Sequence, residues 1–207
     1  MEIVLDIYKK PYNEEFPVVC MDESPKQLIK ETRLPIAASA GSIAKYDYEY
    51  ERCGVCNIFL ANEPLSGKRF IEITEKKTKT DWALFIEKIA IQYPKAKKIT
   101  LVMDNYGTHK PGSLYETFAP EKAKQLLDRF QFIFTPKHGS WLNMAEIELN
   151  VLNGQCLNRR IDSISTVIQE CRAWENHRNQ MNAKINWQFT TKDSRIKLKR
   201  LYPTLQV

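Results

Sequence analysis

Long hydrophobic runs are missing from this sequence: no apolar stretch approaches the roughly 20 residues that a membrane span needs. There is also no internal repeat, no low-complexity segment and no long glycine- and serine-rich linker, which favours a single folded unit with a loosely attached start. The first residues, MEIVLDIYKK, lack the basic start and apolar centre of a signal peptide. We therefore expect a soluble protein with no membrane partner.

Cysteine is too sparse to build a disulfide scaffold. The five cysteines are an odd number, and a chain of 207 residues with 43% hydrophobic residues can bury a core without covalent staples. A reducing compartment is the natural setting, so we expect a cytoplasmic protein. Cys53 and Cys56 form a CGVC pattern, but one such pair without a second is weak evidence of a metal site.

Acidic residues are outnumbered, with 25 Asp and Glu against 31 Lys and Arg, which gives a net charge of +6 and a pI near 9.0. This mild excess suits a polyanionic partner such as nucleic acid. Many of the basic residues lie in two stretches, 68–79 and 191–203, and a solvated face explains each stretch equally well.

Apolar periodicity predicts a mixed α/β fold. Short apolar or alternating runs indicate strands, and helical spacing behind a Thr, Ser or Pro indicates helices. Strands are predicted at 17–22, 46–54, 55–63, 67–75, 97–104 and 131–136, a polar loop at 23–45, and helices at 80–93, 120–130, 141–160 and 164–180. Strands that begin as an antiparallel meander and continue through helical crossovers form a mixed sheet with helices on its faces.

Two aspartates share one local setting. Asp22 follows VVCM and Asp104 follows TLVM, so each comes directly after a buried strand. If these strands lie side by side, the two carboxylates emerge together, and converging carboxylates need a positive charge between them. A pair of Mg²⁺ or Mn²⁺ ions about 4 Å apart is the usual solution in phosphoryl transfer, and oxygen ligands favour these hard ions.

A third carboxylate is expected from the helix predicted at 141–160. Glu146 and Glu148 are both available, but they point roughly 200° apart on a helix, so one face presents only one of them. Periodicity does not choose between the two.

Several motifs in one order carry a family resemblance. From about residue 11 to residue 203 the chain resembles the catalytic part of bacterial insertion-sequence transposases of the mariner superfamily, which are DDE endonucleases with a ribonuclease H-like fold. The motifs are VVCMDESPKQL, DYEYERCGVCNIFLANEPLSGKR, LVMDNYGTHKPGSLYETF, FTPKHGSWLNMAEIELNVL and FTTKDSRIKLKRLYP. The resemblance implies a ribonuclease H-like mixed sheet with helices on both faces, in a catalytic domain at 15–207 that follows a linker at 1–14 and ends in a basic segment.

The resemblance also implies the chemistry. Asp22 and Asp104 correspond to the family's two aspartates, and Glu146 corresponds to its glutamate because a Leu-Asn pair precedes it by three residues. The gap of 41 residues between Asp104 and Glu146 is long for the family, which keeps Glu148 as a fallback. These residues would hold two Mg²⁺ or Mn²⁺ ions for hydrolysis at transposon ends and for strand transfer. A nuclease of other specificity and an inactive DNA-binding remnant are the alternatives.

Further residues are expected around the carboxylates. Asn105, His109 and His138 would orient the site, although the two histidines, like Lys137, are also explained as ordinary loop residues. Lys137 is placed to meet phosphate, and Trp141 either stacks on a displaced base or, as we favour, anchors a helix start. The expected phosphate contacts elsewhere are Arg159, Arg160, Arg195, Lys197, Lys199 and Arg200.

The resemblance sets expectations about partners as well. Family members pair DNA ends as dimers and carry an amino-terminal helix-turn-helix region, for which the residues before Asp22 are too few. We therefore expect an isolated catalytic portion or one product of a split reading frame, acting as a homodimer on DNA in a bacterial nucleoid.

Overall fold

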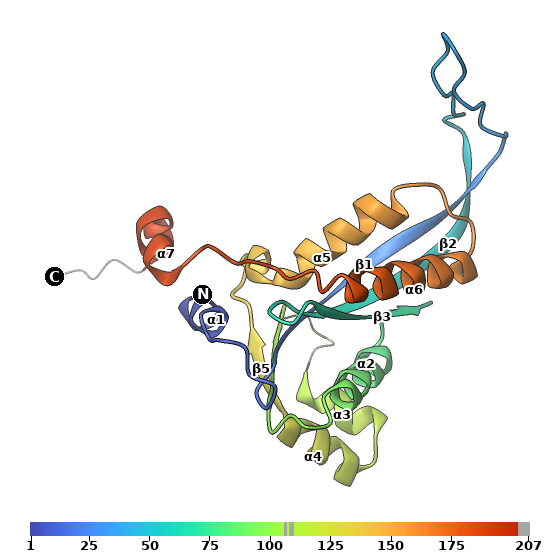
Figure 1. Ribbon diagram of the computed structural model, residues 1–207. Helices are drawn as coiled ribbons and strands as arrows, with labels where there is room; N and C mark the ends of the chain where they lie inside the picture. Colours follow the sequence, from blue (N-terminus) through green and yellow to red (C-terminus); the bar gives the residue numbers. More distant parts are fainter. Residues whose placement is uncertain (106, 108–109, 203–207) are drawn as a thin grey trace.

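A five-stranded mixed sheet forms the centre of the protein (Figure 1). The computed structural model describes residues 1–105, 107 and 110–202. The strand order is β3-β2-β1-β4-β5, in which β1, β2 and β3 pair antiparallel and β1, β4 and β5 pair parallel. The strands are β1 (Val18–Glu31), β2 (Tyr50–Glu63), β3 (Lys68–Thr74), β4 (Ile99–Met103) and β5 (Phe130–Phe134). The mixed sheet predicted from the sequence is confirmed.

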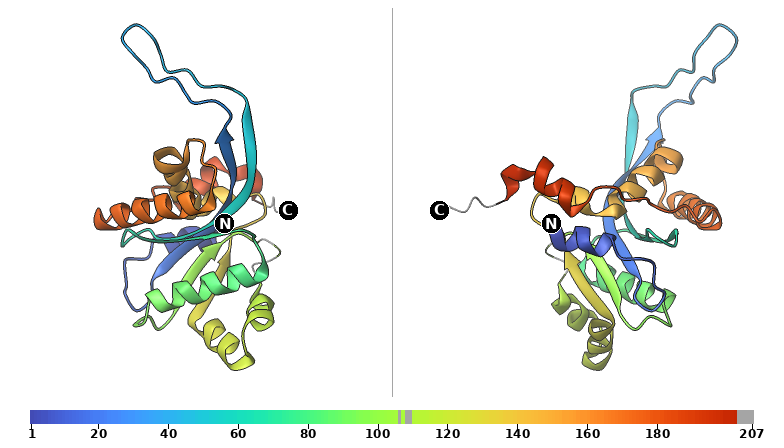
Figure 2. Two further views of the ribbon diagram at one scale, coloured as in Figure 1. Left: turned by 90° about the vertical axis from the view of Figure 1, so that its right-hand side faces the viewer. Right: turned by 60° about the vertical axis from the view of Figure 1, so that its left-hand side comes forward.

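Helices cover both faces of this sheet, as predicted (Figures 1 and 2). One face carries α1 (Glu2–Tyr8), α5 (Met144–Leu152) and α6 (Ile164–Gln180). The opposite face carries α2 (Lys79–Gln92), α3 (Pro111–Thr117) and α4 (Pro120–Arg129). Short 3₁₀ turns span Ser140–Leu142 and Lys199–Leu201, a π-helical turn spans Asn153–Leu157, and α7 (Thr191–Lys197) lies beside α1.

Alternation along the strands divides the core into two layers. In β2, Ile58 and Leu60 belong to the layer under α5 and α6, whereas Phe59 and Ala61 belong to the layer over α2. All five residues of β4 are buried, as expected for a central parallel strand that is covered on both faces. Each layer therefore depends on one face of the same strands.

Capping residues explain where two helices begin. The Thr78 side chain and Asp81 form a reciprocal capping box at α2, and the Ser163 side chain accepts a hydrogen bond from the Thr166 backbone at α6.

The single helix predicted at 141–160 is not continuous. It is divided into the 3₁₀ turn Ser140–Leu142, helix α5 and the π-helical turn Asn153–Leu157.

Strand β1 is longer than predicted. The sequence assigned 17–22 to a strand and 23–45 to a loop, but β1 continues to Glu31 through Pro25. The pairing of β1 with β4 runs from Val18 to Cys20, and beyond that point β1 pairs with β2 as far as Glu31. Proline is tolerated in a strand that has one edge without a strand partner, which is the setting of Pro25 among the described residues. The resulting β1–β2 hairpin projects from the body (Figure 2).

The two strands predicted at 46–54 and 55–63 form a single strand, β2. The pairing register shifts where Leu28 faces Gly54 and Ile29 faces Arg52, which leaves Cys53 as an extra residue, and Gly54 has φ +107°. The Cys-Gly pair is thus a β-bulge rather than a turn. Cys53 is exposed while Cys56 is buried in the core, so the CGVC thiols lie in different environments.

The chain start is also more ordered than predicted. Instead of a loosely attached linker, Glu2–Tyr8 form helix α1, whose Val4, Leu5 and Ile7 are buried against the sheet. The sequence did not predict helix α1, because seven residues are too few to show clear helical periodicity. Within the described residues, no helix is long and apolar enough to cross a membrane.

One glycine is required by a close approach of two segments. Gly67 has φ +75°, and a Cβ there would lie 2.6 Å from the carbonyl carbon of Asn182. We expect Gly67→Ala to lower the free energy of unfolding by about 1–3 kcal/mol, because both the backbone conformation and the contact oppose a side chain. Urea unfolding measures the change.

Gly112→Ala is the matched control for that prediction. A Cβ at Gly112, within α3, meets nothing within 4 Å. Alanine there should be neutral or stabilising by up to about 1 kcal/mol. Equal losses of stability in both variants would contradict the close approach at Gly67.

Candidate active site

The strand register brings Asp22 and Asp104 together. Parallel pairing aligns Cys20 of β1 with Val102 of β4, and each aspartate lies two residues further along its strand direction. Asp22 is within the extended β1, and Asp104 directly follows β4. The predicted juxtaposition of the two carboxylates is confirmed, although Asp22 is not at a strand end.

A third acidic side chain joins these two. One carboxylate oxygen each from Asp22, Glu23 and Asp104 lie within 4.8 Å of one another, and all three residues are partly exposed. Glu23 was missed in the sequence because adjacent strand residues normally point to opposite faces. The DE pair in the sequence is the only local signal of its presence.

The electrostatic setting of Asp22 is unfavourable for a bare carboxylate. The pKa of Asp22 is raised from 3.8 to about 7, mainly by burial and in part by the charges of Asp104, Glu23 and Glu146, while the hydrogen bond from the Glu23 backbone opposes the rise. That backbone N–H donates to Asp22 Oδ1 over 2.8 Å. A cation bound here would relieve the repulsion among these groups.

Glu146 of helix α5 is not one of the three residues whose carboxylate oxygens lie within 4.8 Å of one another. Glu146 lies in the first turn of α5, is partly exposed, and its charge acts on Asp22. The N-cap Asn143 accepts a hydrogen bond from the Ala145 backbone and donates one to Met21 O, which joins α5 to β1. These bonds tie the first turn of α5, which carries Glu146, to the strand that carries Asp22.

Glu148 points elsewhere and has partners of its own. Its side chain is 1% exposed and accepts hydrogen bonds from Arg69 Nε over 2.8 Å and from Arg178 Nη2 over 2.9 Å. Arg69 is equally buried and also donates to the carbonyl oxygens of Gly67 and Ala183. Through these ion pairs Glu148 connects α5 to Arg69 of β3 and to Arg178 of α6.

The loop before α5 borders the carboxylates. A cavity of about 390 Å³ is lined by Asp104, Asn105, Thr135, Lys137, His138 and Ser140. Lys137 and His138 are exposed, and His138 has φ +62°, which is uncommon for a residue other than glycine. The structure thus brings Asn105, Lys137 and His138 to one cavity beside Asp104, while His109 lies outside the described residues.

The other predicted DNA contacts are spread over the surface, and several already have partners. Arg159 pairs with Glu170, and Arg195 makes two hydrogen bonds to Glu2. Arg160 pairs with Glu31 and donates to backbone carbonyls of the β1–β2 connection. Lys197 lies over the Phe189 ring, Lys199 and Arg200 are exposed, and Trp141 is 41% exposed with its ring against Phe189.

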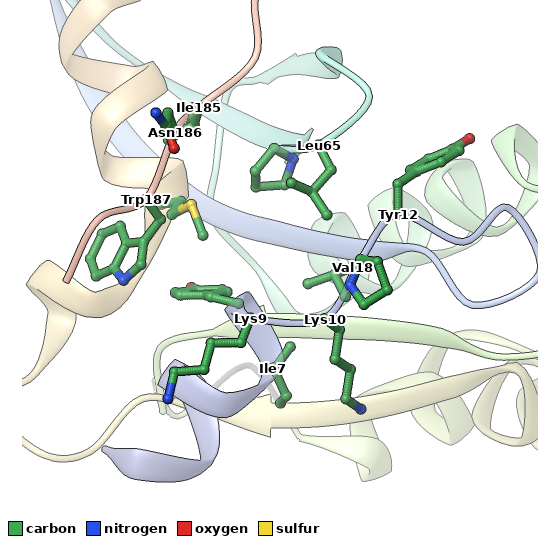
Figure 3. A pocket seen from close by; sticks show the side chains of 13 residues that line it. Ile7, Lys9, Lys10, Tyr12, Val18, Leu65, Ile185, Asn186 and Trp187 are labelled. Carbon is green, nitrogen blue, oxygen red and sulfur yellow. The ribbon is translucent and has the colours of Figure 1, made fainter. Parts of the chain in front are cut away.

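A second cavity, of about 230 Å³, lies apart from the carboxylates (Figure 3). Its apolar wall includes Val18, Leu65 and Trp187, and Lys9 and Lys10 lie at its edge. Val18 precedes Asp22 by four residues, or about 13 Å of strand. Its lining contains no carboxylate, so this cavity offers none of the chemistry of the acidic group.

The acidic group suits a hard divalent cation. Its donors are carboxylate oxygens, partly exposed and within 4.8 Å of one another, and among the residues that the structure describes no thiol or imidazole belongs to the group. The pKa of Asp22 is raised mainly by burial, and the neighbouring negative charges add to the rise, so a bound cation would stabilise the ionised form. Mg²⁺ or Mn²⁺ fits these residues better than zinc, which prefers nitrogen and sulfur ligands.

Solved structures share this fold. The chain is similar to the Mos1 mariner paired-end complex with Mn, at 15% identity and a TM-score of 0.60, covering 88% of this chain and 54% of that one. The Mos1 strand transfer complex matches at 14% identity and a TM-score of 0.59, covering 88% and 53%. The chain therefore has the same ribonuclease H-like fold and spans about half the length of these relatives.

Sequence comparison defines the family. No curated protein matches the chain. A family model described as DDE superfamily endonuclease matches residues 17–168, which include Asp22, Asp104 and Glu146 and cover well over half of the chain. The matched span contains the whole sheet and helix α5. The chain belongs to the DDE superfamily endonucleases.

Proposed function

We propose that this chain is the catalytic domain of a DNA transposase, which hydrolyses phosphodiesters at transposon ends and joins the freed 3′ ends to target DNA. The observation that carries this proposal is the parallel pairing of β1 with β4, which brings Asp22 and Asp104 together in a DDE-family fold. Glu146 is the proposed third carboxylate. Both alternatives, a nuclease of other specificity and an inactive remnant, remain outcomes of the test below.

The proposed roles of the acidic residues follow from their positions. Asp22, Asp104 and Glu146 would hold two Mg²⁺ or Mn²⁺ ions, with Glu23 close enough to add an oxygen ligand. Bound ions of this kind polarise a phosphoryl group and lower the pKa of an attacking water. The chain's own contribution is a set of carboxylates anchored on two paired strands and one helix, which keeps their spacing fixed.

The cavity beside Asp104 is the proposed phosphate site. Lys137 and His138 line it, and both side chains are exposed to solvent. A lysine can neutralise a DNA phosphate, and a histidine can hydrogen-bond a phosphoryl oxygen or transfer a proton. We assign Lys137 to backbone contact and His138 to orientation of the scissile phosphate, with Asn105 as a further donor.

Partners are inferred from the structural relatives. The Mos1 structures are a paired-end complex with Mn, a strand transfer complex, and a paired-end complex with Mg that matches this chain at a TM-score of 0.51. By analogy, we propose that this chain acts on DNA as a homodimer that pairs two transposon ends. Further proposed DNA contacts are Trp141, Arg159, Arg160, Arg195, Lys197, Lys199 and Arg200.

Nicking of a supercoiled plasmid tests the proposed chemistry. The proposal expects the protein to nick plasmid DNA with Mn²⁺ or Mg²⁺ and to lose this activity with EDTA. Cleavage of an RNA–DNA hybrid but not of plasmid would favour a ribonuclease. Plasmid binding without any cleavage by the folded wild-type protein would favour the inactive remnant.

Metal binding should depend on pH through Asp22. Because the pKa of Asp22 is raised to about 7, its carboxyl group holds a proton below neutrality, and that proton must leave before a cation binds. We expect Mn²⁺ affinity to rise up to about tenfold per pH unit toward pH 7 and to level off above it. Calorimetry across this range measures the slope, and an affinity independent of pH would contradict the proposed role of Asp22.

The same pKa has the opposite consequence for the metal-free protein. A carboxyl group whose pKa is raised from 3.8 to about 7 by folding contributes stability that is fully present below pH 3.8. That contribution disappears as the pH rises through about 7. Asp22→Asn should remove this part of the pH dependence, as measured by urea unfolding in EDTA.

A further inference from the structure

The buried side chain of Asn143 joins the two elements that carry the candidate metal ligands. Asn143 is 0% exposed, and its Nδ2 donates to Met21 O of β1 over 2.7 Å. Its Oδ1 accepts from the Ala145 backbone N–H of α5 over 3.2 Å. Met21 is bonded directly to Asp22, and Ala145 is bonded directly to Glu146. One amide therefore links the residues next to both carboxylates.

An amide suits this position because it must donate and accept at once. Its oxygen caps the helix start, and its nitrogen satisfies a carbonyl of the central strand. Aspartate would keep the capping oxygen but place a second acceptor against Met21 O. Since the site is fully buried, water cannot replace the lost bond, and the two elements would shift to relieve the contact.

Other contacts also hold α5, but the residues that make them are not adjacent in sequence to a candidate metal ligand on both sides. Tyr8 donates to Leu142 O just before the helix, and Glu148 binds Arg69 on β3. Those bonds fix where the helix lies on the sheet. The bonds of Asn143 differ because both of its partners are adjacent in sequence to a candidate ligand.

We propose that Asn143 is a positioning residue that sets Glu146 at the distance from Asp22 that cation binding requires. The inference rests on the proposed function, since it concerns the same carboxylates. Asn143 itself faces Met21 O and the helix start, so it acts through the backbone of its two neighbours.

Three variants test the proposal. Asn143→Asp keeps the cap and loses the donor, and Asn143→Ala loses both. Asn179→Ala is the matched control, because Asn179 also donates and accepts one backbone hydrogen bond, to Arg69 O and from Arg69 N, both over 2.9 Å. Asn179 joins α6 to β3 and is adjacent in sequence to none of Asp22, Asp104 and Glu146.

The primary readout is the Mn²⁺ dissociation constant from calorimetry, with urea unfolding measured in parallel. Both Asn143 variants should weaken Mn²⁺ binding about 10- to 100-fold, the range found when groups that orient metal ligands are removed. Asn179→Ala should lose comparable stability yet bind Mn²⁺ within about twofold of wild type. If Asn143→Ala does not fold, Asn143→Asp carries the test, since its helix cap is intact.

Two results would overturn the inference. One is Mn²⁺ binding within about twofold of wild type in folded Asn143→Asp. The other is an equal weakening in Asn179→Ala, which would reduce Asn143 to a general structural role. Failure of the wild-type protein itself to bind Mn²⁺ would refute the proposed function before any variant is compared, and the inference would fall with it.

Discussion

Asp104→Asn is expected to slow metal-dependent plasmid nicking by about a thousand-fold or more. Asp104 supplies one of the three clustered carboxylate oxygens, and bound cations contribute several kcal/mol of transition-state stabilisation in such sites. Asparagine has nearly the same shape, so the fold should persist. Removing a negative charge beside the phosphate cavity should leave DNA affinity unchanged or higher, as measured by fluorescence anisotropy.

Asp128→Asn is the matched control for this prediction. Asp128 lies in α4, on the face of the sheet that α2 and α3 also cover, and pairs with Lys124 at the surface. The same substitution there should leave nicking within about twofold of wild type, because surface ion pairs contribute little. Nicking by Asp104→Asn within about tenfold of wild type would contradict a ligand role for Asp104.

Glu148→Ala should cause the largest loss of stability. We expect the free energy of unfolding to fall by about 3–5 kcal/mol, because the substitution leaves the Arg69 guanidinium, 1% exposed, without its carboxylate. Urea unfolding measures the change. Replacing both partners, in Arg69→Met with Glu148→Leu, should recover much of the loss, since no uncompensated charge remains buried.

Glu170→Ala provides the comparison at an exposed ion pair. Glu170 pairs with Arg159, and their side chains are 41% and 52% exposed. Its removal should change the free energy of unfolding by less than about 1 kcal/mol. A Glu148→Ala variant as stable as Glu170→Ala would show that the buried network does not hold α5.

Strand chemistry made the centre of the site predictable from sequence. VVCM before Asp22 and TLVM before Asp104 identify two buried strands, and their parallel pairing brings the carboxylates together. The extent of β1 was not predictable, because Pro25 normally ends a strand and its tolerance depends on which strand edge stays unpaired. Gly54 was similarly ambiguous, since a turn and a bulge use glycine for the same reason.

The identity of the third carboxylate required tertiary partners. Helical periodicity places Glu146 and Glu148 on different faces but does not say which face meets the aspartates. The partners of Glu148 favour Glu146, and these partners, Arg69 and Arg178, lie 79 and 30 residues away from Glu148 in the chain. Arg160 and Arg195, both proposed phosphate contacts, also have long-range ion-pair partners, Glu31 and Glu2, which the sequence did not indicate.

Crystals soaked in Mn²⁺ would test the central claim most directly. Anomalous scattering at the manganese edge locates the ion without any assumption about DNA substrate. We expect a peak within ligand distance of the Asp22 and Asp104 carboxylates, with Glu146 facing it. If crystals soaked to saturation with Mn²⁺ show no anomalous peak at these carboxylates, or show peaks only at other acidic residues, the result contradicts a metal-dependent active site in this chain.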